Sequence, residues 1–510
     1  MTKQSLLKGT IILTIGALIT RVLGFANGIV MANVLGPEGV GLIMMAMPLT
    51  GLLITLTTLG LPVAISKLVA EAEVNNDPQR VKKILIVSLT ITSVIGILLM
   101  GGALIGAKVL ASIFLTDQRA YYSLLAVIPI IPIIAVSSVI KGYFRGKQNM
   151  TPIAISQVIE QFSRIGFIFL FVQWLLPYGL EFAAAGAVLS GIIGEAFSLL
   201  YLMSAFKWFK RRRFSFREPF SKVDKGKKVF TDLMQTGLPT TGNGLIHSLI
   251  GVVQPILITQ SLAIAGIGTA MATQQFGIVM GFVMPLLMLP GFVTNSMSIP
   301  LVPAISEAKE HKNSDMIHKR TQQSIRIALI VGVPSSLVLW LFADQLTTVI
   351  YNSPEAAILL KMMAPFHLLQ YFRIPLQSVI IGLGKANLVM VNDLIAHSAK
   401  LGFIFLLASR PDFGIYGVCL GISASVILGT LLHFATISKL VGLRFVPGDF
   451  IKVGISGALM GIIGHGTFDY LSSVTPNQIL LLSVSVFVTM LTYLLLLLLL
   501  GVIKPWRKNR

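Results

Sequence analysis

The stretch ILIVSLTITSVIGILLMGGALIGA (84–107) carries no charged side chain and is bounded by Lys83 and Lys108. A helix of about 20 mainly apolar residues is long enough to cross the hydrocarbon core of a bilayer. The apolar residues here do not alternate with polar ones, as they would in a strand of a membrane β-barrel. Because lipid offers the backbone no hydrogen-bond partner, the stretch predicts a transmembrane helix.

The rest of the chain has a similar composition. Of its 510 residues, 55% are hydrophobic and 12% are charged, whereas soluble domains carry about 25% charged residues. This composition excludes a soluble globular enzyme and a disordered chain. We therefore predict an all-α polytopic membrane protein with about fourteen transmembrane helices. The predicted helices cover residues 9–32, 39–66, 84–108, 121–143, 151–175, 182–206, 229–261, 270–303, 321–345, 355–381, 387–409, 413–438, 449–469 and 477–503.

Basic residues are concentrated on one side of this predicted topology. The chain has 40 Lys and Arg against 20 Asp and Glu, a formal net charge of +20. Such a balance can indicate nucleic-acid binding. With the N-terminus placed inside, however, the outer loops hold only Lys108, Arg119 and Arg410, which is the pattern of a membrane protein with basic cytoplasmic loops. We predict a multi-pass protein of the bacterial cytoplasmic membrane, with both termini cytoplasmic and no nucleic-acid partner.

Two short motifs occur twice in the same order. GLPVAIS (60–66) is similar to LVPAIS (301–306), and GKQNM (146–150) is similar to GKANL (384–388). Six predicted helices separate the copies, so both copies have the same orientation in the membrane. Parallel repeats about an axis along the membrane normal are typical of transporters. We predict an N-lobe of six helices (1–206), a basic cytoplasmic loop (207–228), a C-lobe of six helices (229–440), two further helices (441–503) and a basic cytoplasmic tail (504–510).

Charged side chains inside the predicted helices mark the candidate site. An ionisable residue at the bilayer centre costs about 2.5–3.5 kcal/mol, so these residues should face a hydrated cavity or one another. The candidate substrate-binding cations are Arg21, Arg164, Arg373 and Lys400. The candidate cavity acids, which are also candidates for ion coupling, are Glu160, Glu195 and Asp393.

Spacing suggests a partner for only one of these cations. Glu160 and Arg164 are four residues apart and should form an ion pair on one helix face, with a structural role as an alternative to substrate binding. Arg21, Arg373 and Lys400 have no acid at such a spacing. The resulting excess of cations suits a diphosphate, which arginine binds through charge-assisted hydrogen bonds.

No catalytic or metal-binding motif is recognisable. The seven histidines form no HExxH or other ligand-spaced cluster, and the chain has no GxSxG motif and no Walker A loop. We therefore expect no enzyme activity, metal or cofactor. Active transport would then depend on a proton or sodium gradient, the membrane potential or the substrate gradient.

Prolines within the predicted helices predict bends. The relevant residues are Pro129, Pro132, Pro239, Pro255, Pro285, Pro290, Pro300 and Pro303. In transporters such breaks often line the transport path. A static bend is the alternative.

Five segments together are similar to a known family: TRVLGF (20–25), LGPEGVGLIMMA (35–46), GLPVAISKLVAEA (60–72), KGYFRGKQNMTP (141–152) and LVPAISEA (301–308). In combination they resemble the polysaccharide-transporter branch of the MOP/MATE superfamily, and within it a sporulation protein of endospore-forming bacteria. The resemblance spans essentially the whole chain. It implies a two-lobed protein of fourteen helices that is related to the lipid II flippases and is needed for spore cortex peptidoglycan.

The resemblance also implies a role for Arg21, which matches an arginine in helix 1 of the lipid II flippases. A second family arginine is replaced by Asn27, and the paired arginines of helix 2 have no counterpart in GLLITLTTLG (51–60). We expect an alternating-access flippase for an undecaprenyl-diphosphate-linked glycan, functional as a monomer in the bilayer, with lipid II as the leading substrate. The alternatives are a multidrug or cation antiporter, a membrane glycan polymerase or ligase, and a non-transporting scaffold for cell-wall synthases, which are candidate partners in any case.

Overall fold

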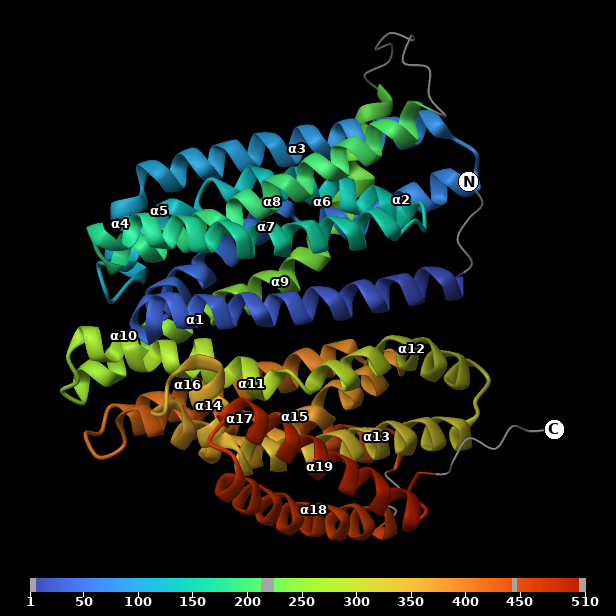
Figure 1. Ribbon diagram of the computed structural model, residues 1–510. Helices are drawn as coiled ribbons and strands as arrows, with labels where there is room; N and C mark the ends of the chain where they lie inside the picture. The colour runs from blue at the N-terminus through green and yellow to red at the C-terminus, as the bar shows by residue number, and fades with distance from the viewer. Residues whose placement is uncertain (1–5, 212–223, 443–446, 504–510) are drawn as a thin grey trace. The chain divides into compact units, whose positions relative to one another are not determined.

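The computed structural model describes residues 6–211, 224–442 and 447–503, and within these ranges every regular element is a helix (Figure 1). The predicted all-α class is therefore confirmed. Of the predicted basic loop 207–228, helix α8 includes residues up to Arg211 and helix α9 begins at Asp224. The remainder of that loop and the predicted tail 504–510 lie outside the described residues.

The chain forms two compact units. Unit 1 comprises Met1–Thr259 and Thr269–Gly277, and unit 2 comprises Gln260–Gly268 and Ile278–Arg510. These two units have different bounds from the predicted lobes, 1–206 and 229–440, and the lobes stay a prediction.

Over its described residues, unit 1 contains ten helices and most of an eleventh, α9. They are α1 (Leu6–Thr58), α2 (Leu61–Val74), α3 (Pro78–Ile105), α4 (Ala107–Phe114), α5 (Ala120–Val127), α6 (Ile130–Gly146), α7 (Thr151–Leu175), the 3₁₀ helix η1 (Leu176–Tyr178), α8 (Leu180–Arg211), α9 (Asp224–Ile264) as far as Thr259, and α10 (Thr269–Gly277). Unit 2 contains the end of α9 and the elements that follow α10. They are the π-helix η2 (Ile278–Val283), α11 (Met284–Met288), α12 (Gly291–Glu310), α13 (Ser314–Leu341), α14 (Ala343–Tyr351), α15 (Ala356–Gly382), α16 (Ala386–Ala408), α17 (Gly414–Val441), α18 (Pro447–Val474) and α19 (Gln478–Leu499).

Eleven helices of the described chain are long and apolar enough to cross a membrane, or twelve if the bent pair α5–α6 is one span. This makes the chain a multi-pass membrane protein, but the count of fourteen stays a prediction. Part of the difference lies at the N-terminus, where the windows 9–32 and 39–66 fall within one nearly continuous helical stretch that is counted once.

Glycines break this N-terminal stretch. Gly36 lies within α1 with φ 69° and ψ 179°, and Pro37 follows it. Gly60, with φ 63°, separates α1 from α2. Positive φ angles are accessible to glycine at little steric cost, and a proline is tolerated in the first turn of a helix. The first break therefore lies in the gap between two predicted windows, and the second lies within the window 39–66.

The prolines have different effects from one helix to another. The axes of α5 and α6 differ by 42°, and Pro129 lies in the break between them. Pro285 is the second residue of α11, directly after the π-helix η2, and Pro290 immediately precedes α12. By contrast, α12 continues through Pro300 and Pro303.

The repeated motifs make equivalent packing contacts in the two units. Ile65 of α2 lies against Gly142 of α6, and Ile305 of α12 lies against Gly382 of α15. A methyl group added to Gly142 would be 3.2 Å from Ile65 Cβ, and one added to Gly382 would be 2.7 Å from Ile305 Cβ. The glycine follows the isoleucine at the same sequence separation in both pairs. The isoleucines belong to the repeated motifs and the glycines lie outside them. In both pairs the absence of a side chain at the glycine lets the two backbones approach.

Candidate functional site

Four charged side chains come together in unit 1 on three helices: Lys141 on α6, Glu160 and Arg164 on α7, and Glu195 on α8. We call them the unit 1 ion cluster. Helices α7 and α8 run side by side (Figure 1). They approach closely because α8 presents Gly194 to α7, where an added methyl group would lie 2.7 Å from the Glu160 carbonyl oxygen.

The unit 1 ion cluster consists of two ion pairs that contact each other. Arg164 Nη2 donates to Glu160 Oε1 at 2.8 Å, and Lys141 Nζ donates to Glu195 Oε1 at 3.1 Å. Glu160 also interacts electrostatically with Lys141 and with Glu195. The ion pair expected from the spacing of Glu160 and Arg164 is present. Since two cations face two acids, the charge of Arg164 is already balanced within the protein.

The cluster includes a residue that the sequence analysis did not single out. Lys141 is the first residue of the motif KGYFRGKQNMTP, which was noted only for its resemblance to a family. Its partner Glu195 is only 5% exposed. The signal available in the sequence was a lysine at the end of a predicted helix, but its pairing with α8 depends on how the helices pack.

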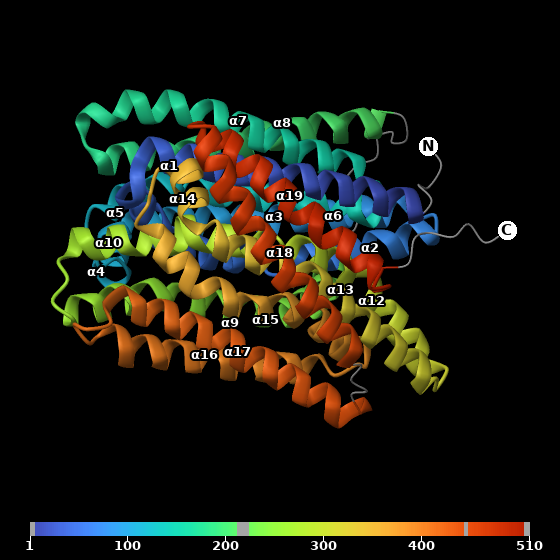
Figure 2. The same ribbon diagram turned by 60° about the horizontal axis from the view of Figure 1, so that its bottom comes forward.

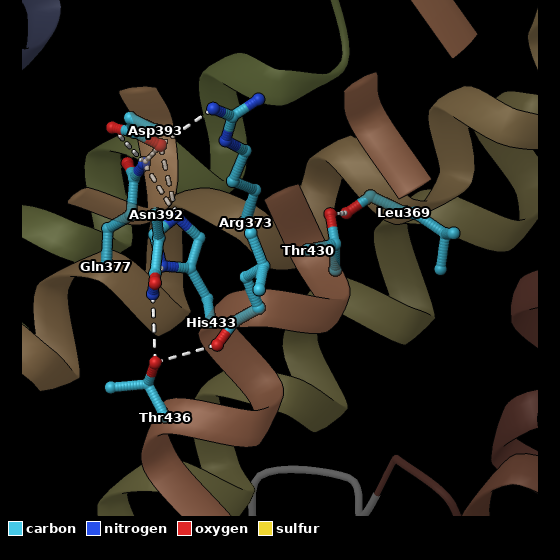
Figure 3. Close-up of polar contacts among 9 residues, drawn as sticks. Leu369, Arg373, Gln377, Asn392, Asp393, Thr430, His433 and Thr436 are labelled. Atoms are coloured by element: carbon cyan, nitrogen blue, oxygen red, sulfur yellow. Dashed lines mark hydrogen bonds and ion pairs between the residues drawn. The ribbon is translucent and has the colours of Figure 1, made fainter. Parts of the chain in front are cut away.

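A second constellation lies in unit 2, where α15, α16 and α17 pack together (Figure 2). Arg373 and Gln377 lie on α15, Asn392 and Asp393 on α16, and His433 and Thr436 on α17, and their side chains point toward one another (Figure 3). We call these six residues the unit 2 polar network.

Asp393 is the centre of this network. Its Oδ1 accepts hydrogen bonds from Arg373 Nη2 at 2.7 Å and from Gln377 Nε2 at 3.0 Å, and it lies 3.2 Å from His433 Nε2. Its Oδ2 also lies 3.0 Å from Gln377 Nε2. The carboxylate is therefore held from two neighbouring helices at once.

The network continues away from Asp393. His433, whose side chain is fully buried, has its Nδ1 3.2 Å from Asn392 Nδ2. The same Asn392 amide donates to Thr436 Oγ1 at 2.9 Å. Thr436 in turn donates to the Leu432 carbonyl oxygen at 2.7 Å. The Asn392 NH₂ group, the Thr436 hydroxyl and both ring nitrogens of His433 thus have defined partners.

Asp393 is therefore the acid partner of Arg373, which sequence spacing had left without one. The expectation that Arg373 has no local acid holds along its own helix, but Asp393 comes from the neighbouring helix α16. Twenty residues and a turn separate the two in sequence, so helical periodicity could not reveal the pair. The contributions of Gln377, Asn392 and His433 were missed for the same reason.

The remaining predicted cations lie in different places. Lys400 is on α16, two turns beyond Asp393; it is 9% exposed and interacts electrostatically with Arg373. Arg21 is on α1 and its side chain is exposed. Arg21 and Arg164 thus belong to unit 1, and Arg373 and Lys400 belong to unit 2. The substrate-binding and ion-coupling roles of the seven predicted residues stay predictions.

A third charged group, which the sequence analysis did not anticipate, lies in unit 1 between membrane-spanning segments. Asp117, in the connection between α4 and α5, is 3% exposed and accepts hydrogen bonds from Arg119 Nη2 and from Thr273 Oγ1, both at 2.8 Å. Arg119 Nη1 also pairs with Glu38 Oε1 at 2.7 Å. Burial alone would raise the pKa of Asp117, but the hydrogen bonds from Arg119 and Thr273 outweigh it, and the pKa lies below its ordinary value of 3.8. We call these four residues the Asp117 cluster.

Among the described residues, no group of three or more His, Cys, Asp or Glu side chains is arranged to hold a metal ion. What the two membrane clusters offer instead is fixed charge: guanidinium and ammonium groups held by carboxylates between packed helices. The fold and these sites define a class, a polytopic helical membrane transporter.

Comparison with known proteins specifies the family. A sequence profile described as "Polysaccharide biosynthesis protein" matches residues 6–309, and one described as "MatE" matches residues 278–405. The chain is 47% identical to stage V sporulation protein B of Bacillus subtilis (strain 168), over 92% of this chain and 91% of that protein. The chain belongs to the polysaccharide biosynthesis protein family of the MOP/MATE superfamily, and it is a transporter rather than an enzyme. The predicted family is confirmed.

Two further similarities are informative. The chain is 25% identical to lipid II flippase MurJ of the same organism, over 84% of this chain and 82% of that protein. A solved structure of lipid II flippase MurJ in an inward closed conformation has the same fold, with a TM-score of 0.71, 15% identity, and coverage of 95% of this chain and 98% of that chain.

Proposed function

We propose that this transporter flips an undecaprenyl-diphosphate-linked glycan across the bacterial cytoplasmic membrane, and that its substrate is the peptidoglycan precursor lipid II used for the spore cortex. The family and the sporulation relative support this substrate class, and the similarity to a lipid II flippase favours the particular lipid. A charged, sugar-bearing headgroup crosses a bare bilayer slowly because it must lose its hydration, so a protein is needed to replace those interactions.

The observation that carries the proposal is the pair of buried cations in unit 2. Arg373 and Lys400 are 8% and 9% exposed and interact electrostatically with each other, and Arg373 is paired with one carboxylate, Asp393. A guanidinium has five N–H donors in a planar fork, and the hydrogen bond from Arg373 Nη2 to Asp393 leaves others to bind phosphate oxygens. Arg21 and Arg164 of unit 1 are the other predicted substrate-binding cations, and the charge of Arg164 is reduced by Glu160.

Several accompanying properties belong to the same proposal. The transporter works by alternating access as a monomer, with both termini in the cytoplasm, because most Lys and Arg residues fall on that side of the predicted topology. Glu160, Glu195 and Asp393 are the candidates for coupling to a proton or sodium gradient, and the membrane potential is the alternative source of energy. Cell-wall synthases are the candidate protein partners.

A drug or cation antiporter is the competing function, and the match of residues 278–405 to the MatE profile favours it. An antiporter for cationic compounds should present acids to its substrate. In unit 2 the central acid, Asp393, is instead occupied by Arg373, His433 and Gln377. We therefore place this function second.

Flipping of fluorescent lipid II in proteoliposomes tests the proposal. The purified parent should accelerate flipping, and Arg373→Ala and Lys400→Ala should each lower the rate by roughly tenfold to a hundredfold, since a hydrogen bond to a charged group contributes roughly 1.5–3 kcal/mol. Lys361→Ala is the matched control, because Lys361 pairs with Asp344 at an exposed position and should leave the rate unchanged. A parent that flips nothing under imposed proton, sodium and potential gradients, but extrudes ethidium, would replace the proposal with the antiporter.

A further inference from the structure

We propose that His433 is a positioning residue for Arg373: as the neutral tautomer with its hydrogen on Nε2, it orients Asp393, and Asp393 orients the guanidinium that binds the headgroup diphosphate. This inference rests on the proposed function for its last step. Its first step, the tautomer of His433, follows from hydrogen-bond geometry alone.

The direction of the hydrogen bonds is set at Thr436. Its hydroxyl has one hydrogen, which it donates to the Leu432 carbonyl oxygen at 2.7 Å. Toward Asn392 the hydroxyl can therefore only accept, so the group facing it at 2.9 Å must be the NH₂ of the Asn392 amide.

That assignment fixes the imidazole. The same NH₂ group lies 3.2 Å from His433 Nδ1, so Nδ1 accepts a hydrogen bond and carries no hydrogen. The ring hydrogen is then on Nε2, which lies 3.2 Å from both Asp393 Oδ1 and Gln377 Nε2. Of these two groups only the carboxylate can accept a hydrogen bond, so Nε2 donates to Asp393. The tautomer is thus selected by a hydroxyl one turn further along α17, through an amide on α16.

The same contacts fix Asp393 independently of Arg373. The carboxylate accepts hydrogen bonds from His433 on α17 and from Gln377 on α15, and neither bond involves Arg373. Arg373 can therefore move its hydrogen bond from Asp393 to a phosphate oxygen and back, because Asp393 keeps its orientation while Arg373 is bound elsewhere. A carboxylate held only by the arginine would lose its orientation each time the arginine bound substrate.

Helix α17 also provides the space for the guanidinium. A methyl group added to Gly429, one turn before His433, would lie 3.1 Å from Arg373 Cζ. Next to it, Thr430 Oγ1 donates to the Leu369 carbonyl oxygen at 3.1 Å and ties α17 to α15 (Figure 3). One face of α17 thus accommodates Arg373, orients its acid partner and anchors its helix.

Nitrogen NMR of ¹⁵N-histidine-labelled protein tests the first step. At pH 7.5 the signals that disappear in His433→Gln should be those of an unprotonated Nδ1 and a protonated Nε2. Thr436→Val removes the hydroxyl that sets the order, and the His433 signals should shift or broaden in this variant. Thr467→Val is the control, because Thr467 makes the same kind of helical hydrogen bond at an exposed position on α18. A protonated Nδ1 in the parent would overturn the assignment.

Flipping kinetics test the second step. His433→Phe keeps an aromatic ring but removes both hydrogen bonds, and it should raise the KM for lipid II about tenfold with kcat changed less than about twofold. His433→Gln retains one donor and one acceptor and should recover most of the lost affinity. Thr436→Val should raise KM about twofold to threefold.

These outcomes separate the inference from the proposed function. A lower kcat with an unchanged KM in His433→Phe, or no recovery in His433→Gln, would make His433 a packing residue and overturn the inference. A parent that does not flip lipid II would overturn the proposed function, and with it the link from Asp393 to a headgroup. The NMR result would then decide by itself whether His433 orients Asp393.

Discussion

The unit 1 ion cluster and the unit 2 polar network stabilise buried charge in different ways. In unit 1, two cations face two acids, and Glu160 interacts with Arg164, Lys141 and Glu195 together. In unit 2, one ion pair between Arg373 and Asp393 is surrounded by neutral donors and acceptors with fixed directions. The first arrangement depends on the sum of its charges, and the second depends on the order of its hydrogen bonds.

This difference predicts how each region responds to mutation. When Arg164 of the unit 1 ion cluster is lost, its former partner Glu160 still interacts with Lys141. When Asp393 is lost, Arg373 loses the carboxylate with which it pairs in unit 2. Gln377 and His433 lose the acceptor of their hydrogen bonds as well.

Removal of the central carboxylate should have the largest effect. Asp393→Leu leaves the guanidinium of Arg373 buried without its acid, and it should lower the free energy of unfolding by about 3–5 kcal/mol. Unfolding in detergent, followed by tryptophan fluorescence, measures the change. The double variant Arg373→Met/Asp393→Leu should recover part of the loss, because it removes both charges. If the double variant is less stable than Asp393→Leu, the loss does not come from an unpaired charge.

Changes in the unit 1 ion cluster should cost less. Glu160→Gln and Arg164→Gln should each lower the free energy of unfolding by about 1–2 kcal/mol, because the remaining charges pair with one another. The double variant should cost less than the sum of the two single changes, since the residues interact directly. A loss for Glu160→Gln as large as that for Asp393→Leu would remove the distinction between the two regions.

The Asp117 cluster extends the comparison to charges outside the membrane-spanning segments, where pH can act. Because the pKa of folded Asp117 lies below 3.8, its carboxylate stabilises the fold above that pH, and this contribution disappears as the pH falls through the folded-state pKa. Asp117→Asn should therefore be about 1–2 kcal/mol less stable than the parent at pH 6. The difference should shrink below pH 3.8. Thermal unfolding between pH 3 and 7 checks this, and a difference that does not change with pH would assign the effect to shape rather than charge.

The exposed pair of Lys361 and Asp344 should show the smallest effect. Their side chains are 41% and 57% exposed, and such ion pairs contribute about 0–1 kcal/mol. Lys361→Ala should shift the unfolding midpoint by no more than the scatter between repeated measurements of the parent. A loss comparable to that of Glu160→Gln would show that burial is not what separates these sites.

The sequence predicts a structural feature when the residues that form it are close together in the chain or lie in repeated segments. Continuous apolar windows predicted the helices. The repeated motifs predicted an internal repeat, and in each unit the isoleucine of the motif, Ile65 or Ile305, contacts a glycine that lies outside the matched motifs, Gly142 or Gly382. The spacing of Glu160 and Arg164 predicted their ion pair, because a helix brings residues four apart onto one face. All of these depend on local periodicity or on sequence identity between segments.

Contacts between helices could not be foreseen in the same way. The pairs Lys141–Glu195 and Arg373–Asp393 require a specific rotation of two helices about their axes, which a single sequence does not encode in any spacing. His433 was only one histidine in an apolar helix. Its importance becomes visible when Asn392 and Asp393 are placed opposite its two ring nitrogens.

Unit 1 is built from two separate segments of the chain, and this affects the order of its biosynthesis. Its last segment, Thr269–Gly277, follows a stretch of unit 2, and Thr273 in that segment donates to Asp117. A ribosome that has released residues 1–206 into the membrane has therefore not yet supplied everything that unit 1 requires. Unit 1 can be completed only after synthesis has passed Gly277, so its first helices must wait in the bilayer for partners from the second half of the chain. A nascent chain stalled before this point should be a preferred substrate for membrane proteases.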